Sequence, residues 1–363
     1  MDFAELAFER IEGIKLKDNS FYDKKNIHTS SSFNLKETLN STVHDSNVVF
    51  LFSVSSSEDE VLANNLIRKE LYLMEDIKAK FLFIDLGNLN ISIDKAETAF
   101  KYIFSEIEEN INCNFKFIIL SQSRKMLPAL VAGITENEIV VTDINLAFDN
   151  EQEFLNLHRH DKVRFYNLLS ALQFYYNKEI RNDTYFLNLL RLGEIKNDIY
   201  LVEPYIRESA VVIHSANSVS SAFAPGAEIN SPNGLDAYNF SILSYLSAIS
   251  NVKYNIYTAF LNYQNDKTNI TGKLFAQSIW IFLNSFTNAI IETPTFDIEQ
   301  FEKLIHFYPE IDLEIVFLKS KKTKRYWVNI PNSNYFVAIS DKEYVNITKG
   351  DMPERILKIL RKL

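Results

Sequence analysis

Short apolar runs of strand length recur along the chain, and longer segments with helical spacing separate them. The runs occupy residues 48–54, 80–85, 115–120, 139–143, 210–214 and 252–258. In the segments between them, apolar residues repeat at intervals of three and four, which predicts helices at 58–76, 95–109, 163–176, 237–248 and 271–288. Strands that are apolar throughout and alternate with helices are typical of a parallel sheet covered on both faces. We therefore expect a three-layer α/β/α sandwich with a mainly parallel sheet.

The pattern changes at both ends of the chain. Residues 1–45 include a long polar stretch without a sustained period, which predicts an irregular lead-in. After Pro294, residues 314–330 predict two strands around a lysine-rich turn, and residues 334–340 predict a third strand. Because roughly sixty residues form only a marginal core, we expect 295–363 to be a small β appendage on the same sheet, within one domain spanning 1–363.

Composition narrows the function classes. The 363 residues are 47% hydrophobic and 23% charged, which suits a globular protein with a large core. The net charge of −9 and the lack of a long basic run disfavour nucleic-acid binding. The most apolar stretches are far shorter than the roughly 20 residues that cross a bilayer. Cys113 is the single cysteine and the first residues resemble no export signal, so we expect a cytoplasmic protein without a membrane or nucleic-acid partner.

Residues 211–240, VVIHSANSVSSAFAPGAEINSPNGLDAYNF, are the most specific text in the chain. They resemble the signature S-x-D-x-D-x-x-D-P-x-x-A-P-G, followed by a P-N-G-L turn, of the ureohydrolase superfamily of arginases, agmatinases and formimidoylglutamases. The matching residues are Ala224, Pro225 and Gly226, then Pro232, Asn233, Gly234 and Leu235. Residues 257–286 look like that family's last core strand and the long helix after it, and formimidoylglutamase-like proteins are the nearest in character. The resemblance implies an arginase-like fold and hydrolysis of C–N bonds in linear amidines.

In that family, four Asp and two His at strand ends hold two manganese ions, which activate a bridging water. The resemblance places Ser215 and Asn217 at two metal-binding Asp positions, and Arg124 at the first ligand His. Aligning VVTDINLAFDN on its last Phe and Asp places Asn145 and Ala147 at the next Asp and His, with Asp149 the surviving acid. A register that begins at Asp143 leaves at most two acids. The glutamate that supports the ligands from a later strand becomes Phe260.

These replacements lead us to expect no manganese, with Asp149 and Asp143 as the weak metal candidates. The favoured hypothesis is a ureohydrolase-fold pseudoenzyme that has a binding or structural role and forms a homo-oligomer. One alternative is a divergent hydrolase of linear amidines that uses Asp149, Asp143 and His214. Another is a metal-free binder of a small anionic or amino-acid-like metabolite, with Arg124, Lys125 and Asn233 as donors.

Other polar residues have ordinary structural explanations. Strand alternation directs His214 away from Ser215, so we expect it to pack behind the sheet. The run HRHD at 158–161 is interpreted as solvated surface, and Cys113, which follows several acids, as an unreactive thiol. Ser55, Ser56 and Ser57, followed by acids at 58–60, predict a helix N-cap.

Overall fold

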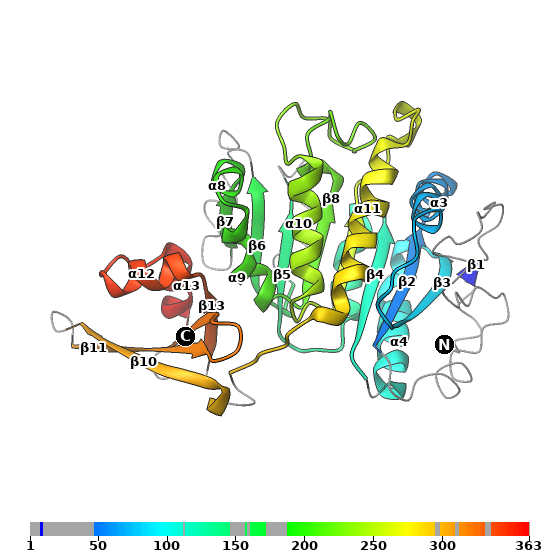
Figure 1. Ribbon diagram of the computed structural model, residues 1–363. Helices are drawn as coiled ribbons and strands as arrows, with labels where there is room; N and C mark the ends of the chain where they lie inside the picture. The colour runs from blue at the N-terminus through cyan, green and yellow to red at the C-terminus, as the bar shows by residue number, and fades with distance from the viewer. Residues whose placement is uncertain are drawn as a thin grey trace.

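The protein is built around one long twisted sheet (Figure 1). The computed structural model describes residues 8–9, 47–111, 113–145, 157, 160–171, 187–294, 298–308, 312–330 and 335–362. Within them, the sheet has nine strands in the order β1-β3-β2-β4-β9-β8-β5-β6-β7. The eight strands β2 to β9 are parallel, and β1 pairs antiparallel with β3. The strands are β1 (Phe8–Glu9), β2 (Val48–Ser55), β3 (Leu82–Asn90), β4 (Phe115–Ser121), β5 (Ile139–Ile144), β6 (Val163–Ala171), β7 (Leu187–Arg191), β8 (Val211–Ser215) and β9 (Tyr254–Thr258).

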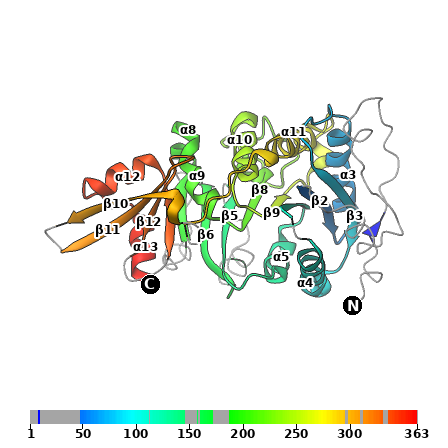
Figure 2. The ribbon, with the colours of Figure 1, turned by 60° about the horizontal axis from the view of Figure 1, so that its bottom comes forward.

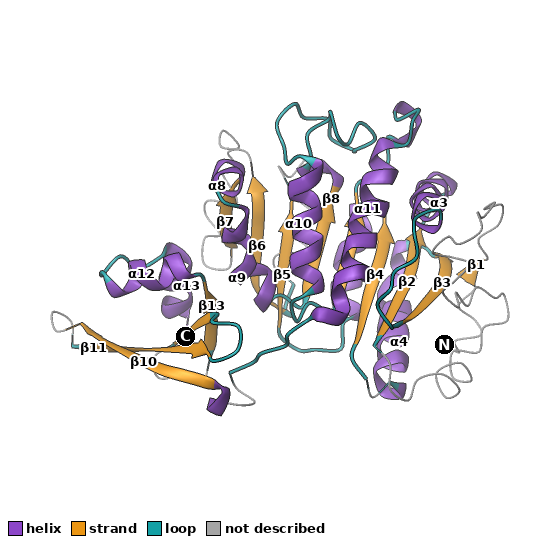
Figure 3. Cartoon of the chain, viewed as in Figure 1, coloured by secondary structure: helices purple, strands orange, loops and turns teal. Residues whose placement is uncertain are grey.

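Helices cover both faces of the sheet, which confirms the predicted three layers (Figures 2 and 3). One face packs against α3 (Glu58–Tyr72), α8 (Leu192–Asn197), α9 (Glu203–Glu208), α10 (Ala237–Ala248) and α11 (Ile270–Ser285). The other packs against α4 (Ile93–Asn110) and α5 (Leu127–Gly133). Because side chains alternate along a strand, Leu51 lies in the first core and Phe50 in the second. Single 3₁₀ turns occur at η2 (Arg124–Met126), η3 (Ile199–Val202), η4 (Ala216–Ser218), η5 (Tyr263–Asn265), η6 (Phe286–Asn288) and η7 (Ile298–Gln300).

Most predicted elements agree with the structure to within a few residues, and α10 has the predicted bounds. The predicted serine cap is also confirmed, because the Ser57 hydroxyl accepts from the backbone N–H of Glu60 at the start of α3. The helix predicted at 163–176 is wrong: residues Val163–Ala171 form β6. Its apolar residues serve both faces of a buried strand, with Leu168 in one core and Leu169 in the other. A run that is apolar on both faces matches the spacing of a helix as well as that of a strand.

The C-terminal residues form a second, antiparallel sheet. Its order is β10 (Phe301–Tyr308), β11 (Leu313–Ser320), β12 (Tyr326–Asn329) and β13 (Phe336–Ile339), followed by α12 (Asp341–Thr348) and α13 (Glu354–Lys362). The strands around the lysine-rich turn and the third strand are confirmed. Their expected place on the main sheet is wrong, because they pair among themselves and dock through side chains. Arg207 of α9 donates to the carbonyls of Tyr326 and Ile339 and stacks on Trp327.

Two further expectations concern the chain as a whole. The two residues of β1 fall within the predicted irregular lead-in, and the remainder of 1–45 lies outside the described residues. The single-domain organisation of residues 1–363 stays a prediction. Among the residues described, no helix combines the length and apolar character needed to cross a membrane.

Candidate functional site

Parallel strands end at the same edge of a sheet, and ligand sites of open α/β folds lie at that edge. Here β4, β9, β8 and β5 are consecutive in the sheet. Their ends bring together the regions of Arg124 and Ser215, at two of the expected metal-ligand positions, with Phe260, at the ligand-supporting position, and Asp143, the weak metal candidate of the alternative register. Asn145 directly follows β5 and is buried. Ala147 and Asp149 lie outside the described residues.

An ion pair joins two of these positions. The Arg124 guanidinium donates from Nη2 to Asp143 Oδ2 at 2.6 Å, and from Nη1 to Oδ1 at 3.4 Å. The Arg124 side chain is 11% exposed and that of Asp143 is 0% exposed. The Tyr166 hydroxyl, on β6, donates to Asp143 Oδ2 at 2.5 Å. Both oxygens of the carboxylate are therefore engaged by protein donors.

Asp143 and, to a smaller extent, Glu228 stabilise the positive charge on Arg124. Burial opposes the charge on Arg124, but the Asp143 carboxylate outweighs that effect and holds the pKa of the guanidinium above its ordinary value. Burial and then the same carboxylate raise the pKa of Tyr166, so its phenol stays protonated and donates. The group thus contains one cation, one anion and one neutral donor, and its charges cancel.

Ser215 and Asn217 use their side chains to shape the loop after β8. The Ser215 hydroxyl accepts from the Asn217 N–H at 3.3 Å. Asn217 Oδ1 accepts from the Ile229 N–H at 2.9 Å. Both side chains are neutral and buried. In the position where the resemblance expects two metal-binding carboxylates, the chain has two hydrogen-bonding groups that fix the backbone.

Phe260 fills the remaining ligand-supporting position with an aromatic ring. It is fully buried and follows β9. A Cβ added to Gly226 would lie 2.4 Å from Phe260 Cε2, so only glycine lets the loop approach the ring this closely. The Gly226 N–H donates to Thr271 Oγ1 of α11 at 2.8 Å. Gly226, which matches the sequence signature, therefore packs the loop onto β9 and α11.

The other predicted residues are dispersed. Lys125 and Asn233 are exposed, whereas Arg124 faces Asp143. His214 packs behind the sheet as expected: its ring stacks on Tyr257 with centroids 4.7 Å apart, and burial lowers its pKa to about 3.

Two minor candidates have equally ordinary surroundings. Burial raises the pKa of the Cys113 thiol, in keeping with an unreactive cysteine. In the HRHD run, Asp161 is exposed, and His158 lies outside the described residues.

Sequence reasoning missed a second buried ion pair, which lies in the middle of β3. Arg68 of α3 donates to both carboxylate oxygens of Asp85 on β3, at 2.9 and 3.1 Å. Its remaining N–H groups donate to Ser53 Oγ, Asn88 Oδ1 and the Gly87 carbonyl. All N–H groups of the guanidinium are used in hydrogen bonds, so this ion pair has a structural role in linking α3 to β2 and β3. The available signal was Asp85, an acid inside an otherwise apolar run.

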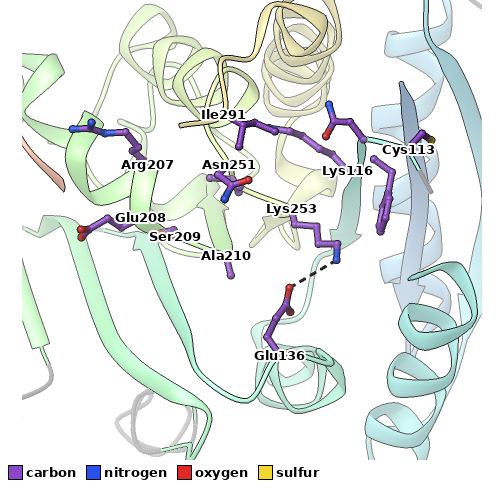
Figure 4. Close-up of a pocket in the computed structure, with 13 residues that line it drawn as sticks. Cys113, Lys116, Glu136, Arg207, Glu208, Ser209, Ala210, Asn251, Lys253 and Ile291 are labelled. Atoms are coloured by element: carbon purple, nitrogen blue, oxygen red, sulfur yellow. Dashed lines mark ion pairs between the residues drawn. The ribbon is translucent and has the colours of Figure 1, made fainter. Parts of the chain in front are cut away.

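A pocket of about 360 Å³ lies at the opposite end of the sheet (Figure 4). Lys116, Lys253 and Ala210, at or just before the starts of β4, β9 and β8, line it. Lys116 Nζ donates to three backbone carbonyls at the end of α10, and burial lowers its pKa to about 7. Lys253 lies 2.6 Å from Glu108 and 3.8 Å from Glu136. Both lysines are thus engaged with protein groups.

The site positions that the structure describes do not fit a dimanganese centre. Two divalent cations need several anionic ligands for charge neutralisation. At the described positions, the carboxylate is Asp143, and Arg124 already neutralises it. Across the described part of the chain, no three His, Cys, Asp or Glu side chains are grouped so as to hold a metal ion.

Comparison with known proteins identifies the architecture. No protein-family model and no curated protein matches the sequence. Solved structures do match. A Trypanosoma cruzi formiminoglutamase determined with Mn²⁺ aligns with a TM-score of 0.58 at 11% identity, over 70% of this chain and 98% of its own. Formimidoylglutamase from Bacillus subtilis gives 0.56 at 13% identity, over 68% and 89%.

Arginase from Medicago truncatula gives 0.56 at 11% identity, over 69% of this chain and 91% of its own. At identities this low, the structural matches show that the fold is shared and nothing further. The sequence resemblance is therefore confirmed at that level: this chain has the ureohydrolase fold, with an added four-stranded C-terminal sheet.

Proposed function

We propose that this chain is a catalytically inactive ureohydrolase-fold protein with a binding or structural role. The observation that carries the proposal is the buried ion pair between Arg124 and Asp143. It sets a fixed cation and a neutralised carboxylate at the sheet edge where the resemblance expects metal ligands.

The chemistry of amidine hydrolysis explains why this matters. A guanidinium or formimino carbon needs a strong nucleophile at neutral pH, and a bound metal ion would provide it by lowering the pKa of its bound water to give hydroxide. Around Arg124, a further cation would meet electrostatic repulsion in a site of low dielectric. Ser215 and Asn217 bring no compensating charge, and their oxygens accept backbone N–H groups.

The same ion pair also argues against a metal-free site for an anionic metabolite. Such a site would need Arg124 as its main donor, and Arg124 directs both terminal nitrogens to Asp143. An incoming carboxylate would have to displace a carboxylate that is already buried and bonded. The exposed Lys125 alone would offer a weak, solvent-screened contact.

The experiment measures metal and turnover together. Purified protein is incubated with excess Mn²⁺ and desalted, and its metal content is determined. Hydrolysis of formiminoglutamate, arginine and agmatine is then assayed with and without Mn²⁺. We expect no stoichiometric manganese and no turnover. Two manganese ions per chain together with hydrolysis of any of these amidines would refute the proposal in favour of a divergent hydrolase.

A further inference from the structure

The outer face of α10 carries a stripe of apolar residues. Tyr238, Ile242, Tyr245 and Ile249 follow one another at intervals of four, three and four, which keeps them on one side of a helix. Tyr238 is 73% exposed and Tyr245 is 41% exposed, while Ile242 and Ile249 are half-buried. In Figure 1, α10 lies in the open on the face of the sheet nearest the viewer.

This helix has no charged residue. Its sequence is AYNFSILSYLSA, and its inner face already supplies Phe240, Leu243 and Leu246 to the core. A surface helix ordinarily carries charged or polar residues on its outer side. Single exposed tyrosines need no explanation, but a continuous apolar stripe marks an interaction surface. Tyr200, a further exposed aromatic residue at 60% exposure, lies on η3, which contacts α10.

We propose that the α10 stripe binds the α10 stripe of a second copy of this chain, about a two-fold axis. The spacing is the same in both directions, so two antiparallel helices bring Tyr238 against Ile249 and Ile242 against Tyr245 of the other copy. Every aromatic ring then meets an aliphatic side chain, which suits interdigitated packing. A two-fold interface requires this kind of self-complementary surface.

Charge favours this face over others for self-association. Each chain carries a net charge of −9, so two copies repel one another over much of their surfaces. The neutral α10 face lets them meet without placing like charges in contact. The helix is about 18 Å long, and a stable interface takes about 800 Å² from each partner. The flanking η3 turn with Tyr200 must therefore contribute to the contact.

The inference goes beyond the proposed function and does not depend on it, because an active hydrolase could pair through the same helix. Molar mass is measured by light scattering during gel filtration at micromolar concentration. We expect a dimer for the natural sequence and a monomer for Tyr245→Arg. Leu62→Arg is the matched control, since Leu62 is 51% exposed on α3, and it should stay dimeric. Circular dichroism checks that both variants are folded.

Disulfide trapping tests the orientation, because Cys113 is the only natural cysteine and can be replaced by serine. In that background, Tyr238→Cys mixed with Ile249→Cys should form a cross-linked dimer under mild oxidation, and neither variant should do so alone. A monomeric natural protein, or an oligomer that Tyr245→Arg leaves intact, overturns the proposal. So does cross-linking of Tyr238→Cys to itself. Manganese content and turnover do not report on these contacts, so failure here is separable from failure of the proposed function.

Discussion

Arg124 and Asp143 form an ion pair 2.6 Å long although the strands that bring them together are not neighbours. Arg124 follows β4 and Asp143 lies near the end of β5, and β9 and β8 separate those two strands in the sheet. The pair therefore spans the edge at which ureohydrolase-like ligand positions meet. The Arg124 guanidinium thus links the ends of β4 and β5 at this edge of the sheet.

The ion pair should be costly to break from one side. Asp143→Ala leaves a buried guanidinium without its partner, and we expect a loss of about 3 to 5 kcal/mol in the free energy of unfolding. Adding Arg124→Met should recover much of that loss, because it removes the stranded charge. Urea unfolding measures both. The control is the pair of half-buried Arg164 with exposed Glu138, and Glu138→Ala should cost less than about 1 kcal/mol. A small loss for Asp143→Ala, equal to that of the control, would contradict this account.

Restoring carboxylates at the signature alone should not create a manganese site. The double variant Ser215→Asp, Asn217→Asp adds two acids but leaves Arg124 in place beside Asp143. We expect no stoichiometric manganese after desalting, and a melting temperature that excess Mn²⁺ raises very little. Elemental analysis and a thermal melt check this. If the double variant alone retains two manganese ions per chain, the repulsion assigned to Arg124 is not the obstacle.

His214 should make the protein less stable as the pH falls. Burial lowers its pKa to about 3 in the folded state, while the ordinary value is 6.5. Below pH 6.5 the unfolded chain binds a proton that the folded protein excludes, so stability declines as pH falls toward 3. By pH 5 this amounts to about 2 kcal/mol. In His214→Phe the free energy of unfolding should fall correspondingly less between pH 7 and pH 5.

The control for this titration is Ile256→Val on β9, a buried change that removes no titratable group. Its free energy of unfolding should change between pH 7 and pH 5 by as much as that of the natural sequence. Equal slopes for the natural sequence and His214→Phe would show that His214 takes no part in the acid response.

The fold was predictable because its strands are apolar throughout and its helices are periodic, as in β2 and α4. β6 was misassigned since a strand buried on both faces also matches helical spacing. β10 was missed: its burial alternates along a partly exposed strand, and Ile305 and Phe307 point to solvent. The candidate site was harder. Arg124 and Asp143 are 19 residues apart, and their contact depends on a sheet order that local patterns do not encode. Likewise, the acid Asp85 stands out within its apolar run, but nothing in the sequence indicates that Arg68 is its partner.

The surviving signature residues should matter for folding. Gly226 has no room for a side chain, because a Cβ there would lie 2.4 Å from Phe260 Cε2. Gly226→Val must therefore displace the ring or the loop, and we expect a loss of several kcal/mol in the range of overpacked cores or reduced soluble yield. Gly226→Ala should cause a smaller loss of stability than Gly226→Val. Adding Phe260→Leu to Gly226→Ala should recover part of that loss, because it vacates the space that the ring occupies. Chemical unfolding of the single and double variants measures this coupling.

Asp149→Ala separates this architectural role from a catalytic one. Asp149 lies outside the described residues, and it is the acid that the resemblance leaves at a metal-binding position. In an inactive protein its loss should change neither stability nor oligomeric mass appreciably, whereas Gly226→Val should damage both. In a metal hydrolase the order reverses, since losing a ligand abolishes turnover while the fold survives. The two variants are compared for unfolding, molar mass and hydrolysis of formimino and guanidino substrates. If Asp149→Ala eliminates a measurable hydrolysis and leaves the fold intact, the chain is an enzyme and the Arg124–Asp143 pair belongs to a working site.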